Sequence, residues 1–162
     1  MHHITFGCRT GLRVSEYALG TANFGTGPSA TAQPDEARAI FEAFAEAGGT
    51  FIDTADRYQN GQSEAVLSGL LAGDRDRFVL STKYTRGSGG NAGISETGNG
   101  RKTMIRSLEA SLKRLKTDYV DGTGPTCPTR SPPSKRSSRP STISCAPERS
   151  CTGAYPTSLP GG

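Results

Sequence analysis

Three polar residues with acid–base chemistry, Asp53, Tyr58 and Lys83, stand at the ends of two short apolar segments. Asp53 closes the run Thr50–Ile52, and Tyr58 follows five residues later. Lys83 interrupts the apolar run 78–84, where an ionised ammonium needs a partner. An ammonium beside a phenol stabilises the phenolate, and a carboxylate beside the ammonium keeps it charged and oriented. Together the three groups could form a proton donor.

Each of these residues also has an ordinary structural interpretation. An aspartate at a strand end is more often a turn former or helix cap than a catalyst. The alternative is therefore a buried ion pair between Lys83 and Asp53, with Tyr58 packed beside it as an aromatic side chain. The elements that carry the residues help to decide between the two.

The chain around these residues alternates between strand and helix patterns. Strands are predicted at 17–21, 50–53, 78–84 and from Tyr119, after an N-terminal hairpin formed by 4–6 and 12–14. Three helices are predicted between these strands: the first begins at Pro34 and ends at Gly48, the second opens at Ser63 and ends at Gly73, and the third carries Ile105, Leu108, Leu112 and Leu115. This order implies parallel strands joined by right-handed crossovers.

The positions of the polar residues favour a barrel over an open sheet. Thr21, Asp53 and Lys83 end three successive strands, and in a (β/α)8 barrel these ends converge on one catalytic face. An open doubly wound sheet usually carries a glycine-rich phosphate loop. The segment 25–27 lacks the third glycine of that fingerprint. We therefore predict an α/β fold that is the N-terminal portion of a (β/α)8 TIM-type barrel.

Four segments together resemble the aldo-keto reductase family over about residues 10–121. They are ALGTANFG, GGTFIDTADRYQNGQSEAVLSGLL, FVLSTKY and GRKTMIRSLEASLKRLKTDYVD. The combination of DTAxxY, the following SE, a strand-borne TK and SLxRLxxDYVD is far more specific than any one piece. The resemblance covers the first four βα elements of such a barrel.

The resemblance implies an oxidoreductase that reduces aldehydes or ketones by hydride transfer from a nicotinamide cofactor. By the same resemblance, the catalytic residues are Tyr58, Lys83 and Asp53, with Tyr58 as the proton donor for the developing alkoxide. The implied cofactor-binding residues are Gly20, Thr21 and Asp53. The family habit favours NADPH, with NADH left open, and the partner is a small carbonyl substrate of unspecified identity.

Residues 122–162 differ in kind from residues 1–121. Eight of the ten prolines, three of the four cysteines and the whole formal charge of +4 lie after Asp121, without helical or strand periodicity. We predict a disordered, basic Pro/Ser-rich tail. The cysteines have no zinc spacing, so neither a metal site nor a disulfide framework is expected.

The chain departs from the family pattern at this boundary. The family continues after DYVD with a strand that carries a fourth catalytic residue, a histidine, whereas the only histidines here are His2 and His3. Permissible codons for Thr123–Arg130, regrouped one base earlier, encode Tyr-Trp-Ala-His-Met-Pro-Asp-Ala, and the following codons can continue as a helix and strand without a stop. We interpret the tail as a frameshifted translation, so that the barrel is truncated after about four strands and this chain is inactive.

The sequence also allows two other classes of function. A non-catalytic barrel that acts as a regulatory or binding subunit would not need Asp53, Tyr58 and Lys83. A nucleic-acid or anionic-surface binder acting through the basic tail is disfavoured, because Tyr155 is the only aromatic residue there. Without an apolar run long enough for a membrane span or a signal peptide, we expect no membrane partner and a cytoplasmic location. The oligomeric state is left open.

Overall fold

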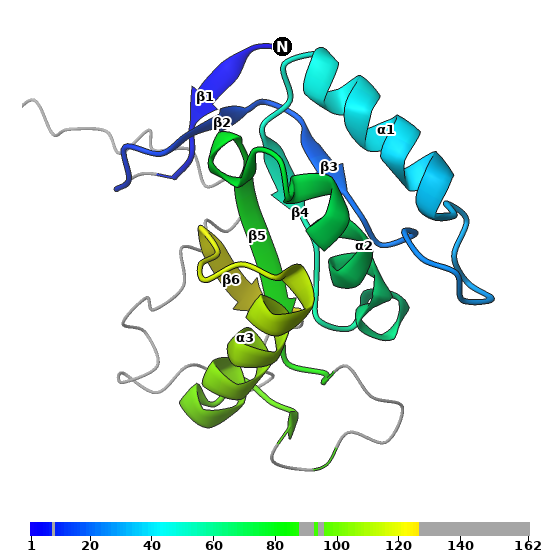
Figure 1. Cartoon of the computed structure of the whole chain (residues 1–162). Helices are drawn as coiled ribbons and strands as arrows, with labels where there is room; N and C mark the ends of the chain where they lie inside the picture. Colours follow the sequence, from blue (N-terminus) through cyan, green and yellow to red (C-terminus); the bar gives the residue numbers. More distant parts are fainter. Residues whose placement is uncertain (8, 88–92, 94–95, 127–162) are drawn as a thin grey trace, which may run out of the picture.

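The computed structural model describes residues 1–162 apart from 8, 88–92, 94–95 and 127–162 (Figure 1). Two strands form an N-terminal hairpin, β1 (His3–Thr5) and β2 (Arg13–Ser15). A second sheet contains β3 (Ala18–Gly20), β4 (Phe51–Asp53), β5 (Val79–Tyr84) and β6 (Gly122–Pro125). The helices are α1 (Pro34–Glu46), α2 (Gln62–Leu71) and α3 (Arg101–Leu115), with the short 3-10 turns η1 (Tyr58–Gly61) and η2 (Arg75–Arg77).

The second sheet is parallel, and its strands follow the order β3-β4-β5-β6. Helices connect successive strands, with α1 beside α2 and α2 beside α3 (Figure 1). A doubly wound sheet would reverse its strand order at a switch point, and the four described strands have no such reversal. The arrangement is the one expected for the first half of a (β/α)8 barrel.

Side chains alternate between the two faces of the sheet. Ile52 and Leu80 are fully buried among apolar side chains of the helices, including Leu67 and Leu71 of α2. The alternate residues of β4 and β5, among them Asp53 and Lys83, are half-buried and point to the opposite face of the sheet. In a barrel this opposite face is the interior, so the period of two places the polar groups where a ligand would approach.

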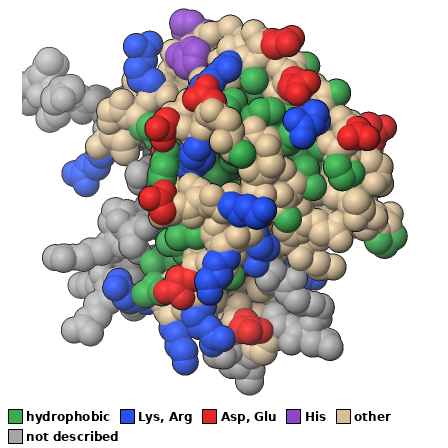
Figure 2. Space-filling view, viewed as in Figure 1, with side chains coloured by type: hydrophobic (Ala, Val, Ile, Leu, Met, Phe, Trp, Pro, Cys, Tyr) green, Lys and Arg blue, Asp and Glu red, His purple; other side chains and the backbone are tan. Residues whose placement is uncertain are grey.

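Helix α3 buries only part of the apolar face that its sequence predicts: Leu115 is buried, Leu108 and Leu112 are half-buried, and Ile105 is 37% exposed. Thr103, Ser111 and Leu115 are buried, whereas most of its basic side chains are exposed. Figure 2 shows blue basic side chains gathered over this part of the molecule. The helix ends at Leu115, and the backbone of the following Lys116 adopts left-handed angles with φ 53°.

The N-terminal hairpin is fastened to the amino-terminal end of β4. Ser15 Oγ accepts hydrogen bonds from the backbone N–H groups of Thr50 and Phe51, both at 3.1 Å. The Phe6 and Phe51 rings meet edge to face with centroids 5.0 Å apart. The hairpin thus fixes the end of the sheet that is opposite the predicted catalytic end.

Most predicted elements are present, with boundaries that differ by one or two residues. The fourth strand is the exception, because it was expected from Tyr119 and begins at Gly122. Asp121 accounts for the shift: its backbone N–H donates to Leu80 O at 3.0 Å, and its carboxylate accepts from Leu80 N at 2.8 Å. The segment 119–121 therefore turns the chain into the sheet before a regular ladder begins.

The predicted start of a disordered tail at residue 122 is wrong for its first residues. Gly122–Pro125 form β6 in register with Ser81–Tyr84. A parallel ladder uses backbone groups, so it does not require the apolar side chains whose absence led to the prediction. The remainder of the predicted tail, 127–162, lies outside the described residues.

Candidate active site

The sheet register brings the predicted residues to one end. Gly20 on β3 pairs with Asp53 on β4, and Asp53 pairs with Ser81 on β5. Lys83 therefore lies two residues further toward the carboxyl end of β5 than the partner of Asp53 does. That offset leaves room for the long lysine side chain to return toward Asp53.

The Lys83 ammonium is the centre of the site. Its Nζ atom lies 2.5 Å from Asp53 Oδ2, 3.0 Å from Thr54 O and 3.2 Å from Tyr58 Oη, and it donates to all three. A lysine ammonium has three protons, so these partners match its donor capacity. The Lys83 and Asp53 side chains are 24% and 35% exposed, which leaves the pair accessible to a ligand.

Tyr58 reaches Lys83 because the loop after β4 is bound along the end of β5. The N–H groups of Thr54 and Asp56 donate to Ser81 O and Lys83 O at 2.8 and 3.1 Å. The chain then turns through η1, where Gln59 and Asn60 have φ values of 49° and 55°. These bonds place a half-buried phenol, rather than a surface tyrosine, beside the ammonium.

The loop after β3 is joined to the same region. Gln59 Nε2 donates to Ala22 O at 2.9 Å, and Gln62 Oε1 accepts from Thr26 N at 2.8 Å. Gly25, with φ 157°, passes so close to Gln62 and Gln59 that a Cβ atom would lie 3.0–3.1 Å from their side chains. The glycine-rich segment is therefore a packed wall beside the tyrosine loop.

A second layer of polar groups lies beneath the loop. Asp56 is 1% exposed, and Ser107 of α3 donates to its Oδ2 atom at 2.9 Å. Burial raises the pKa of the Asp56 carboxyl above its usual range, with Glu64 adding to the rise and the bond from Ser107 opposing it. Among the described residues, Asp56 Oδ1 has no hydrogen-bond partner.

Two further predicted residues occupy different environments. Gly20 is exposed, and an added Cβ would find no atom within 4 Å. Thr21 is fully buried and donates through Oγ1 to Asp53 O at 3.3 Å. The space at Gly20, beside Asp53, is therefore open, whereas the Thr21 hydroxyl is directed into the protein.

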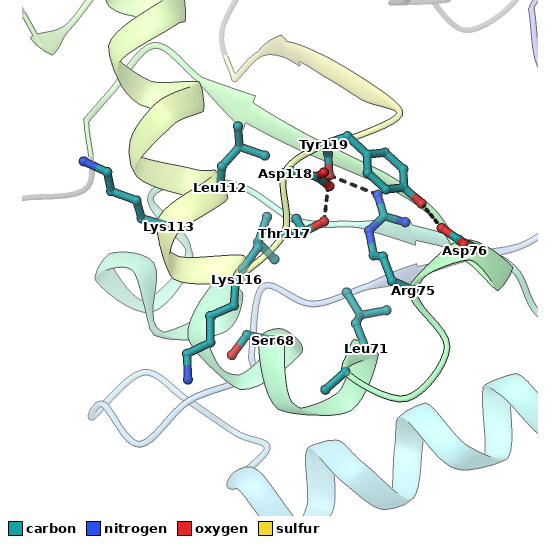
Figure 3. Close-up of a pocket in the computed structure, with 12 residues that line it drawn as sticks. Ser68, Leu71, Arg75, Asp76, Leu112, Lys113, Lys116, Thr117, Asp118 and Tyr119 are labelled. Carbon is teal, nitrogen blue, oxygen red and sulfur yellow. Dashed lines mark hydrogen bonds between the residues drawn. The ribbon is translucent and has the colours of Figure 1, made fainter.

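A separate pocket lies on the helical side, between the carboxyl ends of α2 and α3 (Figure 3). Leu71, Leu112 and Leu115 contribute apolar surface, and Arg75 and Tyr119 lie at its edge. Tyr119 Oη donates to Asp76 at 2.6 Å, while the Arg75 guanidinium donates to the Tyr119 carbonyl at 3.2 Å. None of the three catalytic candidates lines this pocket. The polar groups of Arg75, Asp76 and Tyr119 bond to one another across its edge.

Sequence reasoning identified Asp53, Tyr58 and Lys83 but gave no separate role to the polar residues behind them. Thr54, Ser63, Glu64 and Thr82 are each at most 1% exposed. The available signal was their position: Thr54 follows Asp53, Thr82 precedes Lys83, and the Ser-Glu pair begins a helix. The hydrogen bonds between them join different strands and helices, so they cannot be inferred without the register of the sheet.

The fold defines a class of protein: it is the N-terminal part of a (β/α)8-type barrel, with Asp53, Tyr58 and Lys83 gathered at the carboxyl ends of the strands. The family model for the aldo/keto reductase family matches residues 17–128. The chain therefore belongs to the aldo/keto reductase family, whose members are oxidoreductases.

Individual relatives agree with this assignment. Norsolorinic acid reductase of Aspergillus flavus is 40% identical over 129 residues, which are 74% of this chain and 33% of that protein. Norsolorinic acid reductase of Emericella nidulans is 41% identical over 129 residues, which again are 74% of this chain and 33% of that protein. The chain thus spans about a third of the length of these relatives.

Solved structures give the same fold. A candidate aldo-keto reductase from Pseudomonas aeruginosa superposes with a TM-score of 0.63 and 34% identity, covering 76% of this chain and 46% of that one. An aldo-keto reductase from Bacillus halodurans, solved in its holo form, gives 0.62 and 27% identity, covering 77% and 40%. Both likenesses support the barrel-type fold that the register of β3–β6 indicates.

Proposed function

We propose that this chain derives from an enzyme that reduces aldehydes or ketones with a nicotinamide cofactor, and that Tyr58 is its proton donor. The observation that carries the proposal is the position of Lys83 Nζ, 2.5 Å from Asp53 Oδ2 and 3.2 Å from Tyr58 Oη. A purely structural ion pair would not need a half-buried phenol at its open side. The family membership and the exposed Gly20 beside Asp53 support a cofactor there, and NADPH is the family's usual choice.

The proposed reaction divides the chemistry between cofactor and protein. A bound reduced nicotinamide would supply a hydride to the carbonyl carbon, which would leave negative charge on the carbonyl oxygen. Tyr58 Oη donates its proton to that oxygen and completes the alcohol. The Lys83 ammonium stabilises the phenolate that remains, Asp53 balances the ammonium, and solvent returns the proton to Tyr58.

We further propose that the reading frame changes next to Asp121 and that the 162-residue chain is inactive. The resemblance implies that the strand after DYVD carries the family's catalytic histidine, whereas β6 here consists of Gly122–Pro125. Sequencing genomic DNA across the codons for Tyr119–Pro128 tests the proposal. Relative to a reading frame that continues the family pattern after DYVD, we expect this interval to have one additional or one missing base. A genomic sequence without such a change would contradict the proposal.

The functional test compares the 162-residue chain with a frame-restored protein. We expect the restored protein to oxidise NADPH in the presence of a small aldehyde and the 162-residue chain not to do so. In the restored protein, Tyr58→Phe is expected to abolish turnover while cofactor binding, measured by fluorescence, is nearly unchanged. Wild-type turnover in Tyr58→Phe would show that Tyr58 is not the acid.

A further inference from the structure

A buried set of hydroxyl groups joins the three strands that carry the site. Thr21 and Thr54 directly follow β3 and β4, Thr82 lies in the second half of β5, and each is at most 1% exposed. Thr54 directly follows Asp53, and Thr82 directly precedes Lys83. Each threonine is therefore adjacent in sequence to a predicted residue of the site.

Ser63, in the first turn of α2, binds two of these threonines. Its Oγ atom donates to Thr21 O at 2.7 Å and lies 2.9 and 3.3 Å from the hydroxyls of Thr21 and Thr54. Thr21 in turn donates its backbone N–H to Asp53 O at 3.1 Å, and Thr54 O accepts from Lys83 Nζ at 3.0 Å. The Ser63 hydroxyl is thus connected through Thr21 to the backbone of Asp53 and through Thr54 to the Lys83 ammonium.

Glu64, the next residue, binds the third threonine. Thr82 Oγ1 donates to Glu64 Oε1 at 2.6 Å, and Arg114 Nε of α3 donates to Glu64 Oε2 at 2.7 Å. Glu64 is 0% exposed, so these donors replace the water that its carboxylate would otherwise bind. The carboxylate therefore fixes the strand end beside Lys83 relative to two helices.

We infer that Ser63 and Glu64 are positioning residues that hold the ends of β3, β4 and β5 in the geometry that Asp53, Tyr58 and Lys83 require. Both side chains are buried and hydrogen-bonded, and they come from the helix that directly follows the tyrosine loop. A shift of one strand end would separate Lys83 Nζ from Asp53 or from the phenol. The inference rests on the proposed reductase function for its catalytic consequence, but its geometric part can be measured without activity.

The first measurement is amide hydrogen exchange in the 162-residue chain and in the frame-restored protein. Ser63→Ala removes the hydroxyl, and Thr82→Val removes the donor to Glu64 with little change in shape. Both are expected to speed exchange at the amides of Thr21, Thr54 and Asp56 by about 10-fold or more. Ser68→Ala is the matched control, because the Ser68 hydroxyl donates only one turn back, to Ala65 O at 2.8 Å.

The second measurement is single-turnover hydride transfer in the frame-restored protein. A misplaced acid is expected to lower the rate in Ser63→Ala and Thr82→Val by about 10-fold to 100-fold while the cofactor Kd is unchanged. Thr82→Ser keeps the hydroxyl and loses only a methyl group, so it should retain the rate even where its melting temperature falls. Ser68→Ala should retain both.

The two measurements separate the possible failures. If the restored wild-type protein reduces no carbonyl, the proposed function fails, and the exchange data still decide whether Ser63 and Glu64 hold the strand ends. Unchanged exchange at the three amides in both variants would overturn the positioning inference. Equal rates in Thr82→Val and Thr82→Ser, with lower melting temperatures alone, would also overturn it, because a structural role predicts that pattern.

Discussion

Lys83 and Asp53 form an ion pair of 2.5 Å although their backbones are not paired with each other. Asp53 is in register with Ser81, so the lysine side chain extends from two residues further along β5 and returns across the strand end. This offset places the ammonium between the carboxylate and the tyrosine loop. A directly paired lysine would lie further from Tyr58.

This relationship predicts different outcomes for the two members of the pair in the frame-restored protein. Lys83→Met keeps the approximate side-chain volume but removes the charge beside the phenol, so we expect hydride transfer to slow by about 10²-fold to 10⁴-fold. Asp53→Asn leaves the ammonium near Tyr58 and should slow transfer less. Single-turnover kinetics measure both effects.

A structural ion pair would give another pattern. Each variant would leave one partially buried group without its partner, so both would lower the melting temperature while the folded enzyme kept its rate. Thermal melts recorded beside the kinetics distinguish the cases. Normal rates with lowered melting temperatures in both variants would refute the catalytic roles of Asp53 and Lys83.

Asp56 predicts a pH dependence of stability. Its pKa is raised by burial in the folded state, so the folded chain holds this proton more tightly than the unfolded chain does. The resulting stabilisation is full below the usual value of 3.8 and is lost as the pH rises through the higher folded pKa. Asp56→Asn cannot titrate and can still accept the hydrogen bond from Ser107.

We therefore expect the free energy of unfolding of Asp56→Asn, relative to wild type, to increase from acidic pH toward neutrality and then level off. Urea denaturation at a series of pH values measures this difference. Asp118→Asn, at an exposed position, is the control and should show no comparable increase. A flat difference for Asp56→Asn would contradict the raised pKa.

Arg75 is expected to stabilise the chain at the entrance to β6. Its guanidinium donates to Phe78 O at 2.6 Å and to Asp121 Oδ2 at 2.9 Å, and it stacks 4.1 Å from the centroid of the Tyr119 ring (Figure 3). Arg75→Met should lower the free energy of unfolding by about 2–4 kcal/mol, since several charge-assisted bonds are lost.

A surface arginine provides the comparison for Arg75. Arg38 lies 3.9 Å from Glu42 on α1, and both side chains are 58% exposed. Arg38→Met should therefore change stability by less than about 0.5 kcal/mol. Equal effects of the two substitutions in denaturant titrations would show that the Arg75 contacts do not stabilise the fold.

The sequence predicted local features better than tertiary ones. The Pro34 start, the glycine stops and the apolar periods predicted helices and strands, because these signals act within a few residues. Asp53, Tyr58 and Lys83 could be grouped because strand ends of a barrel converge. The resemblance to a family then restricted their roles.

Other features depend on contacts between distant segments. The burial of Asp56 requires Ser107, which lies 51 residues away, and the role of Ser63 requires Thr21, which lies 42 residues away. A fourth strand was expected from Tyr119, but its position at Gly122–Pro125 could not be predicted, because its ladder with β5 uses backbone atoms that every sequence provides. A single sequence without the register contains no direct signal for these contacts.

The last prediction concerns the attachment of the hairpin to the sheet. Ser15 is 1% exposed, and its hydroxyl oxygen accepts from the N–H groups of Thr50 and Phe51 while donating to Tyr17 O at 2.7 Å. Ser15→Ala would leave two backbone donors at the start of β4 without this acceptor, in a site closed to water. We expect it to lower the free energy of unfolding by about 2–4 kcal/mol. Ser68→Ala is the control, and its cost should be below about 1 kcal/mol because helix α2 loses only a local bond. Denaturant titration of both variants checks the difference, and faster exchange at the Thr50 and Phe51 amides should accompany it. If Ser15→Ala proves no more costly than Ser68→Ala, the hairpin does not depend on the serine for its attachment to β4.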